Sequence, residues 1–178
     1  MPRWEISDEE WSEEIAEGFA NTGIIPGILA RPPPGLININ YDIHSCIHMG
    51  NVLSASVTMK PPKVSWPTER GRLYSLMMLE TDSMSLHWLK VNIVRSDMMT
   101  GDTVVPYHPP AHQGQFLMVA LLQTGELPPD ILPHTDCLHR VDLRRMITHL
   151  HSELVVAANY WRQQPARDRL GSYAVCGE

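Results

Sequence analysis

The sequence predicts a mainly β protein, a β-sandwich with short peripheral helices at the N-terminus and in the C-terminal third. Two observations lead to this prediction. About seven short segments between residues 36 and 123 either alternate in polarity or are continuously apolar, and turn residues separate them. The 15 Pro and 11 Gly among 178 residues also favour turns over long helices. This length fits one domain, so we expect a single domain over residues 1–178.

The N-terminal residues 1–23 predict an amphipathic helix that ends near Gly23. Ser7 is a suitable N-cap, because Glu10 follows three residues later and completes a capping box. Three apolar side chains recur at four-residue steps and form one stripe, namely Trp11, Ile15 and Phe19.

The segments LYSLMMLE (73–80) and LHWLKVNIV (86–94) predict the centre of a β core over residues 24–124. The first is almost continuously apolar, which is typical of a strand buried on both faces. The other expected strands of this core are residues 36–41, 52–59, 61–66, 103–107 and 116–123. In the C-terminal third, over 140–161, the pattern predicts a helix within 142–154 and a last strand at 154–161.

Charge and composition exclude several classes of protein. The net charge of −6 disfavours nucleic acid as a partner, because affinity for phosphate backbones comes from Lys and Arg. The longest strongly apolar run, FLMVALL, is too short to span a membrane as a helix.

The three cysteines, Cys46, Cys137 and Cys176, form no close pair in the sequence, so we expect reduced thiols and a cytoplasmic location. We also expect a monomer.

No pattern in the sequence indicates an enzyme. GxSxG, HExxH and the glycine-rich phosphate loops are absent. The pairs His44/His48 and His108/His112 have four-residue spacing, but Gly and Pro around them predict loops, in which this spacing fixes no metal geometry. We therefore predict a non-enzymatic protein without a metal or other cofactor.

One cluster at the ends of the central strands could bind a ligand. Glu80 and Asp82 follow the first central strand, and His87 opens the next one. A carboxylate beside an imidazole favours the protonated ring, which could meet an anion, or the pair could merely fix the loop. The residues that we expect to line the site are Glu80, Asp82, His87, Pro109, Pro110 and Gly114.

Several segments occur in an order that resembles the phosphatidylethanolamine-binding protein family, which includes Raf-kinase-inhibitor-type proteins and plant flowering regulators. In GNVLSASVTMKPPKVSW, the positions that match a GxxLxxxxxxxxPxVxW pattern are Gly50, Leu53, Pro62, Val64 and Trp66. The other similar segments are GIIPGILARPPPGLININY, LYSLMMLETD, LHWLKVNI, GDTVVPYHPPAHQG and LVVAANYW. The resemblance implies a β-sandwich with a small anion pocket near the sheet ends and makes His87 a ligand residue.

The departures from the family pattern predict a weakened site. The DPDxP motif corresponds to residues 80–84, where Glu80 and Asp82 keep the acids but both prolines are lost. The histidine and arginine of the GxHR motif are replaced by Phe116 and Leu117. The loss of one charge-assisted hydrogen bond costs about 1.5–3 kcal/mol of binding free energy.

The resemblance suggests a binding or regulatory module for a phosphate-bearing or other anionic small molecule, such as a phospholipid head group. Two alternatives stay open. One is a scaffold or protein-interaction subunit with a vestigial pocket, as in a mitoribosomal relative of this family. The other is an inhibitor of a kinase or protease, so a protein partner is also expected.

Overall fold

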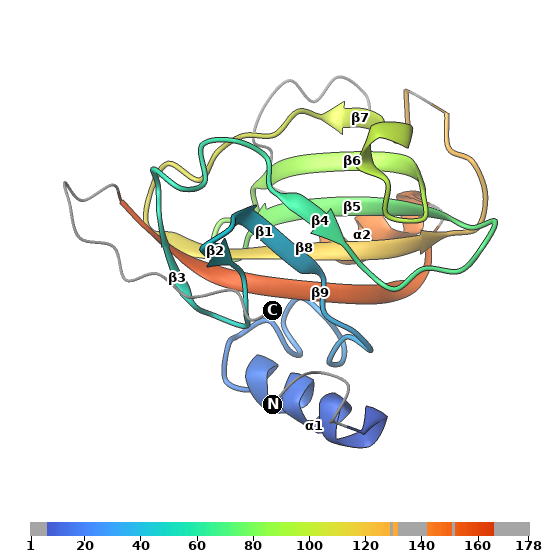
Figure 1. The fold of residues 1–178 in the computed structure, drawn as a ribbon. Helices are drawn as coiled ribbons and strands as arrows, with labels where there is room; N and C mark the ends of the chain where they lie inside the picture. Colours follow the sequence, from blue (N-terminus) through green and yellow to red (C-terminus); the bar gives the residue numbers. More distant parts are fainter. Residues whose placement is uncertain (1–6, 129, 132–141, 151, 166–178) are drawn as a thin grey trace.

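The computed structural model describes residues 7–128, 130–131, 142–150 and 152–165. Figure 1 shows two layers of strands with short helices at the periphery, which confirms the predicted fold class. The elements in chain order are α1 (Asp8–Phe19), β1 (Asn38–Asp42), β2 (Ser45–Cys46), β3 (Val52–Ser54), β4 (Lys63–Ser65), β5 (Leu73–Glu80), β6 (Leu86–Val94), the 3-10 helix η2 (Met98–Thr100), β7 (Asp102–Val105), β8 (Gly114–Gln123), α2 (Leu143–His149) and β9 (Ser152–Gln164).

The larger sheet separates two hydrophobic clusters. Its strand order is β3-β9-β8-β5-β6-β7, and the smaller sheet has the order β2-β1-β4. Met77 and Leu79 of β5 pack in the cluster that contains side chains of α1 and α2, whereas Leu76 and Met78 pack in the cluster that contains side chains of β1. Strand β5 is therefore buried on both faces, as its apolar sequence predicts.

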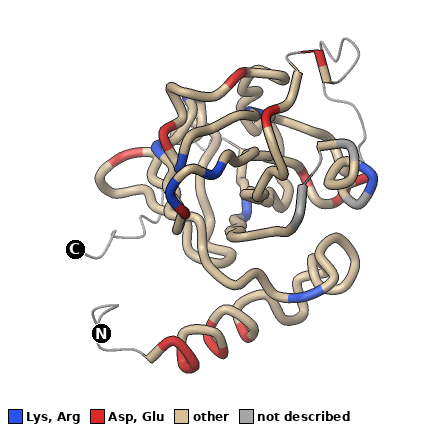
Figure 2. Tube along the Cα trace, turned by 90° about the vertical axis from the view of Figure 1, so that its right-hand side faces the viewer, with Lys and Arg blue, Asp and Glu red and all other residues tan. Residues whose placement is uncertain are grey.

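Helix α1 begins with the predicted capping box, and Ile15 and Phe19 lie buried on its inner face. Most of its acidic residues are exposed, and their positions along the helix are coloured red in Figure 2. The helix ends at Phe19 and not near Gly23, because Asn21 and Gly23 both adopt positive φ angles. The Thr22 hydroxyl donates to the Phe19 carbonyl oxygen and satisfies one free acceptor at the helix end.

Two further predicted boundaries were wrong. The strand predicted over residues 52–59 stops at Ser54, where Val57 N–H donates to the Ser54 carbonyl oxygen and forms a turn. The helix predicted within 142–154 ends at His149, and β9 begins at Ser152. Pairing of this strand with β8 overrides the helical periodicity of the segment. The two-residue strand β2 was not predicted.

The prediction of three reduced thiols was also wrong. Cys46 is disulfide-bonded, and its partner lies outside the described residues, because these contain no second cysteine. The argument that placed the protein in the cytoplasm therefore no longer holds. In the described part of the chain, no helix is both long enough and apolar enough to cross a membrane.

A buried network of side-chain amides ties three central strands together at one end of the larger sheet. The Gln123 carbonyl oxygen accepts from the Ser75 hydroxyl at 2.8 Å and from the Asn92 backbone N–H at 2.8 Å. Its amide nitrogen donates to the Asn92 side-chain oxygen at 2.9 Å and to the Gly125 carbonyl oxygen at 2.9 Å. This network, the Asn92–Gln123 cluster, links β5, β6 and β8 at this end of the sheet.

Candidate anion-binding site

The candidate site lies at the opposite end of these strands from the Asn92–Gln123 cluster. Glu80 is the last residue of β5 and His87 is the second residue of β6. These strands pair antiparallel, and Glu80 N–H donates to the Ser85 carbonyl oxygen across the connecting turn. The turn therefore brings the carboxylate and the imidazole to the same end of the sheet, as the sequence predicts.

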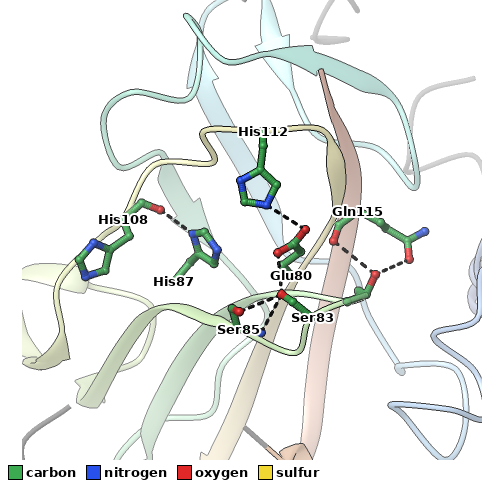
Figure 3. A network of polar contacts seen from close by, with 8 residues as sticks. Glu80, Ser83, Ser85, His87, His108, His112 and Gln115 are labelled. Carbon is green, nitrogen blue, oxygen red and sulfur yellow. Dashed lines mark hydrogen bonds and ion pairs between the residues drawn. The ribbon is translucent and has the colours of Figure 1, made fainter. Parts of the chain in front are cut away.

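The Glu80 carboxylate is buried, with 6% of the residue exposed, and it accepts two hydrogen bonds. The Ser83 hydroxyl donates to Oε2 at 2.6 Å, and His112 Nε2 lies 3.2 Å from Oε1 (Figure 3). A Cβ atom at Gly114 would lie 2.7 Å from Oε1, so a larger residue would require the carboxylate to shift. The carboxylate is thus held from three sides by two loops and the start of β8.

The two ring nitrogens of His87 differ in their hydrogen bonding. Nδ1 bonds to a backbone carbonyl, whereas Nε2 has no hydrogen-bond partner among the described residues. The Nδ1 atom lies 2.9 Å from the His108 carbonyl oxygen, and because a carbonyl can only accept, Nδ1 carries the proton. The Nε2 atom is buried and has no hydrogen-bond partner in the part of the chain that the structure describes. The ring edge packs on Phe116, with 4.9 Å between the ring centres. Phe116 therefore provides an apolar wall beside the imidazole.

Burial lowers the pKa of His87 below its ordinary value. The hydrogen bond to the His108 carbonyl and the charge of Glu80 oppose this shift, whereas the charges of His108 and His112 add to it. The neutral ring is therefore favoured, and its unpaired Nε2 presents a lone pair. Buried polar atoms usually have a partner, so this unpaired nitrogen indicates a place where a ligand or water could bind.

Sequence analysis missed two histidines of this site. Both lie in the loop that precedes β8, on either side of Pro109 and Pro110. His108 provides the carbonyl oxygen for His87, and its own Nε2 is buried without a partner. His112 is the exposed member, with 59% of its side chain accessible. The HPPAH pattern was visible, but only the fold of the loop brings His112 to Glu80.

The other predicted site residues differ in their positions. Pro110 is buried and Pro109 is partly buried in the same loop. Asp82 is exposed, and no hydrogen bond or ion pair joins it to another described residue of the site. It instead lines a surface pocket of about 530 Å³ together with Gly114 and Arg162. The structure thus brings Glu80, His87 and Gly114 together, whereas Asp82 is exposed and shares only the surface pocket with Gly114.

The described residues contain no group of three or more His, Cys, Asp or Glu side chains that could hold a metal ion. Glu80 and His112 form a pair, and His87 Nε2 makes no polar contact with either of them. As arranged, the cluster offers hydrogen-bond acceptors in a mostly buried setting. Such a setting suits a small ligand that brings its own donors or protons.

Comparison with known proteins supports the fold and gives distant relatives. No family model matches the sequence. The chain is 28% identical over 129 residues to a putative odorant-binding protein A5 of Drosophila melanogaster. The aligned residues cover 65% of the chain and 61% of that protein. It is 25% identical over 101 residues to a 26 kDa secreted antigen of Toxocara canis, covering 52% of the chain and 38% of that protein. The chain therefore spans less than two thirds of the length of these curated relatives.

Two solved structures share the architecture over most of the chain. A carboxypeptidase Y inhibitor, solved in complex with its cognate proteinase, has a TM-score of 0.72 and 12% identity over 88% of this chain and 97% of the inhibitor. A phosphatidylethanolamine-binding protein of Plasmodium falciparum has a TM-score of 0.62 and 17% identity over 83% of this chain and 96% of that protein. The chain therefore has the fold of binding and inhibitor proteins. It is the fold of the phosphatidylethanolamine-binding protein family, so the predicted resemblance is confirmed at the level of fold.

Proposed function

We propose that the protein is a non-enzymatic binding module that holds a small phosphate-bearing anion at the Glu80–His87 site. The observation that carries this proposal is the buried and unpaired Nε2 of His87, which lies in a ring fixed at its other nitrogen. A buried nitrogen without a partner gains a hydrogen bond when a ligand arrives. Phospholipid head groups and free phosphates share the chemistry that this site could recognise.

We propose weak binding, because the apolar Phe116 ring lies where the family has a histidine. The edge of the His87 ring packs on it at a centroid distance of 4.9 Å. Access also requires movement, since Nε2 is covered in the structure. The exposed His112 is the part of the site that can move at the smallest cost in packing, since 59% of its side chain is accessible to solvent.

An NMR titration tests this function. Inorganic phosphate and phosphoethanolamine are added separately to the protein while the His87 ring and neighbouring amides are followed. We expect saturable shifts at these positions with a dissociation constant in the millimolar range, roughly −4 kcal/mol of binding free energy. The variant His87→Ala should lose the shifts, whereas His44→Ala, at an exposed histidine in the β1–β2 turn, should keep them. Shifts that survive in His87→Ala, or no shifts at all, would reject the proposal.

A protein partner is the second candidate, favoured by the match to the carboxypeptidase Y inhibitor. This match covers 97% of the inhibitor, so the whole inhibitor fold is available for a protease to contact. The direct test measures carboxypeptidase Y activity with increasing amounts of this protein. Stoichiometric inhibition would support an inhibitor, and full activity at a large molar excess would argue against inhibition of this protease.

The cellular location stays a prediction. The disulfide of Cys46 is typical of an oxidising compartment, and one distant relative is a secreted antigen. The electrophoretic mobility of the protein from its native source, compared with and without reductant, distinguishes an oxidising compartment from the cytoplasm. A mobility shift on reduction would support an oxidising compartment, and identical mobility would support the cytoplasm.

A further inference from the structure

We infer that the Glu80–His87 site selects an anion that carries its own proton, namely a phosphate or phosphate monoester in its protonated form, over sulfate and over phosphodiesters. This inference rests on the proposed function and specifies the ligand class of the same site. It follows from the count of donors and acceptors that the buried part of the site presents.

The two buried groups of the site are both hydrogen-bond acceptors. Glu80 is a carboxylate, and its oxygens can only accept while it is ionised. His87 uses its single ring proton on the His108 carbonyl, so Nε2 is also an acceptor. An anion without a hydrogen would therefore face the lone pair of His87 Nε2 and the negatively charged Glu80 carboxylate, and it could donate to neither. An anion with a P–OH group can donate a hydrogen bond to either acceptor.

Among the described residues, no lysine or arginine forms an ion pair with this carboxylate. Among the described residues, the only basic side chain paired with Glu80 is His112, at 3.2 Å. The other titratable groups around His87 are its neighbours His108 and His112 and the Glu80 carboxylate itself. Asp82 and Arg162 line a neighbouring surface pocket, which Gly114 also lines. An anion that shares a proton with Glu80 or His87 is therefore favoured at this site, because the carboxylate repels an anion that carries no proton.

The hydrogen bonds of Glu80 also allow a ligand to replace the present partner of one carboxylate oxygen. The Ser83 hydroxyl occupies Oε2 at 2.6 Å and is itself held near Ser85, with 2.8 Å between the two hydroxyl oxygens. The partner at Oε1 is the exposed His112, at the longer distance of 3.2 Å. A ligand P–OH group can therefore replace His112 at Oε1 and donate there, while the Ser83 contact stays in place (Figure 3).

This chemistry also sets the pH dependence of binding. The second pKa of a phosphate monoester is about 6, so its protonated form becomes scarce above that pH. We expect the apparent affinity for phosphoethanolamine to fall about tenfold for each pH unit above the second pKa. At pH 6, sulfate and the diester glycerophosphoethanolamine should each bind at least about tenfold more weakly than phosphoethanolamine.

Isothermal titration calorimetry with the full chain tests the inference. Phosphoethanolamine, glycerophosphoethanolamine and sulfate are titrated at pH 6 and pH 8, at constant ionic strength, into the wild type, Glu80→Gln and Asp82→Asn. In Glu80→Gln an amide donor replaces one acceptor, so the preference for phosphoethanolamine over sulfate should shrink to within about threefold. Asp82→Asn removes a neighbouring exposed acid and should keep the wild-type preference.

The possible outcomes separate this inference from the proposed function. A preference for phosphoethanolamine in the wild type that shrinks in Glu80→Gln supports the inference. Equal binding of sulfate or of the diester overturns the inference but leaves an anion site. Absence of binding by all three ligands overturns both proposals. The wild-type comparison decides the matter even if Glu80→Gln fails to fold.

Discussion

The same three strands carry a buried polar cluster at each end, and the two clusters differ in how completely their atoms are paired. At the Asn92–Gln123 cluster, Asn92 Oδ1 accepts from Gln123 and from the Leu127 N–H, and its Nδ2 donates to Asp102 and to the Leu127 carbonyl. At the other end, two buried imidazole nitrogens, His87 Nε2 and His108 Nε2, have no partner. A fully paired network fits a structural role, and an incompletely paired one fits a ligand site.

The difference has a structural origin. In the first cluster, side chains on three strands pair with one another, since Gln123 of β8 contacts both Asn92 of β6 and Ser75 of β5. The partners of Glu80 come instead from the β5–β6 turn and from the loop before β8, including Ser83 and His112. Loops can move at a smaller cost in packing than central strands, so the second cluster can open for a ligand while the first stays closed.

The largest effect is expected from Gln123→Ala, which breaks the paired cluster. It leaves the Asn92 N–H and the Ser75 hydroxyl without their acceptor in the core, so the free energy of unfolding should fall by about 2–4 kcal/mol. Urea denaturation measures this loss. The control Gln113→Ala, at an exposed glutamine, should stay within about 0.5 kcal/mol of the wild type. Equal losses in both variants would contradict the assigned role of the cluster.

Gly114→Ala should have the next largest effect, because it crowds the open cluster. The added Cβ would lie 2.7 Å from Glu80 Oε1, and the carboxylate is confined by its burial. We expect a loss of about 1–3 kcal/mol in unfolding free energy and displacement of the His112 contact. Gly125→Ala is the matched control, since no atom lies within 4 Å of its added Cβ. A neutral Gly114→Ala would show that Glu80 is not held as described.

The pH dependence of stability should report on His87. In the unfolded chain this ring takes up a proton near pH 6.5, whereas burial lowers its pKa in the folded protein. Below pH 6.5 the unfolded state therefore binds more protons than the folded state. As the pH is lowered from 6.5 to the folded-state pKa of His87, the unfolding free energy should fall by at most about 1.4 kcal/mol per pH unit. Urea denaturation from pH 7.5 to 5.0 should give a smaller fall in His87→Phe than in the wild type. Identical profiles would place the folded-state pKa of His87 at its ordinary value.

The smallest effect on stability is expected from His112→Asn. Its side chain is 59% exposed, so the contact with Glu80 is largely screened and should contribute less than about 0.5 kcal/mol. Thermal unfolding of the variant and the wild type at pH 7 checks this expectation. A loss above about 1.5 kcal/mol would mean that His112 supports the fold and is not a displaceable part of the site.

Much of the fold was predictable because it depends on local pattern. The bounds of β5 and β6 follow directly from their apolar and alternating runs, and Ser7 with Glu10 marks the start of α1. The end of the predicted C-terminal helix was wrong because pairing with β8 decides where β9 begins. Periodicity reports which face of a segment is apolar, but not which long-range partner it meets.

The candidate site was only partly predictable for the same reason. Glu80 and His87 flank one short turn, so their proximity follows from the order of two strands. The approach of His112 to Glu80 depends on the path of a proline-containing loop over 32 positions of sequence separation. Asp82 was grouped with Glu80 by sequence, yet it is exposed in the turn after β5, whereas Glu80 is buried at the end of the strand.

The central claim is that the Glu80–His87 cluster is built for a ligand and not for stability. The most direct measurement is the unfolding free energy of the wild type and His87→Phe, each with and without saturating phosphate. Without phosphate the two should agree within about 2 kcal/mol, because the phenyl ring keeps the packing and removes an unpaired nitrogen but leaves the His108 carbonyl without its donor. Phosphate at about 100 times its dissociation constant should stabilise only the wild type, by about 2.7 kcal/mol. A large loss of stability in His87→Phe together with no effect of phosphate on the wild type would contradict the claim.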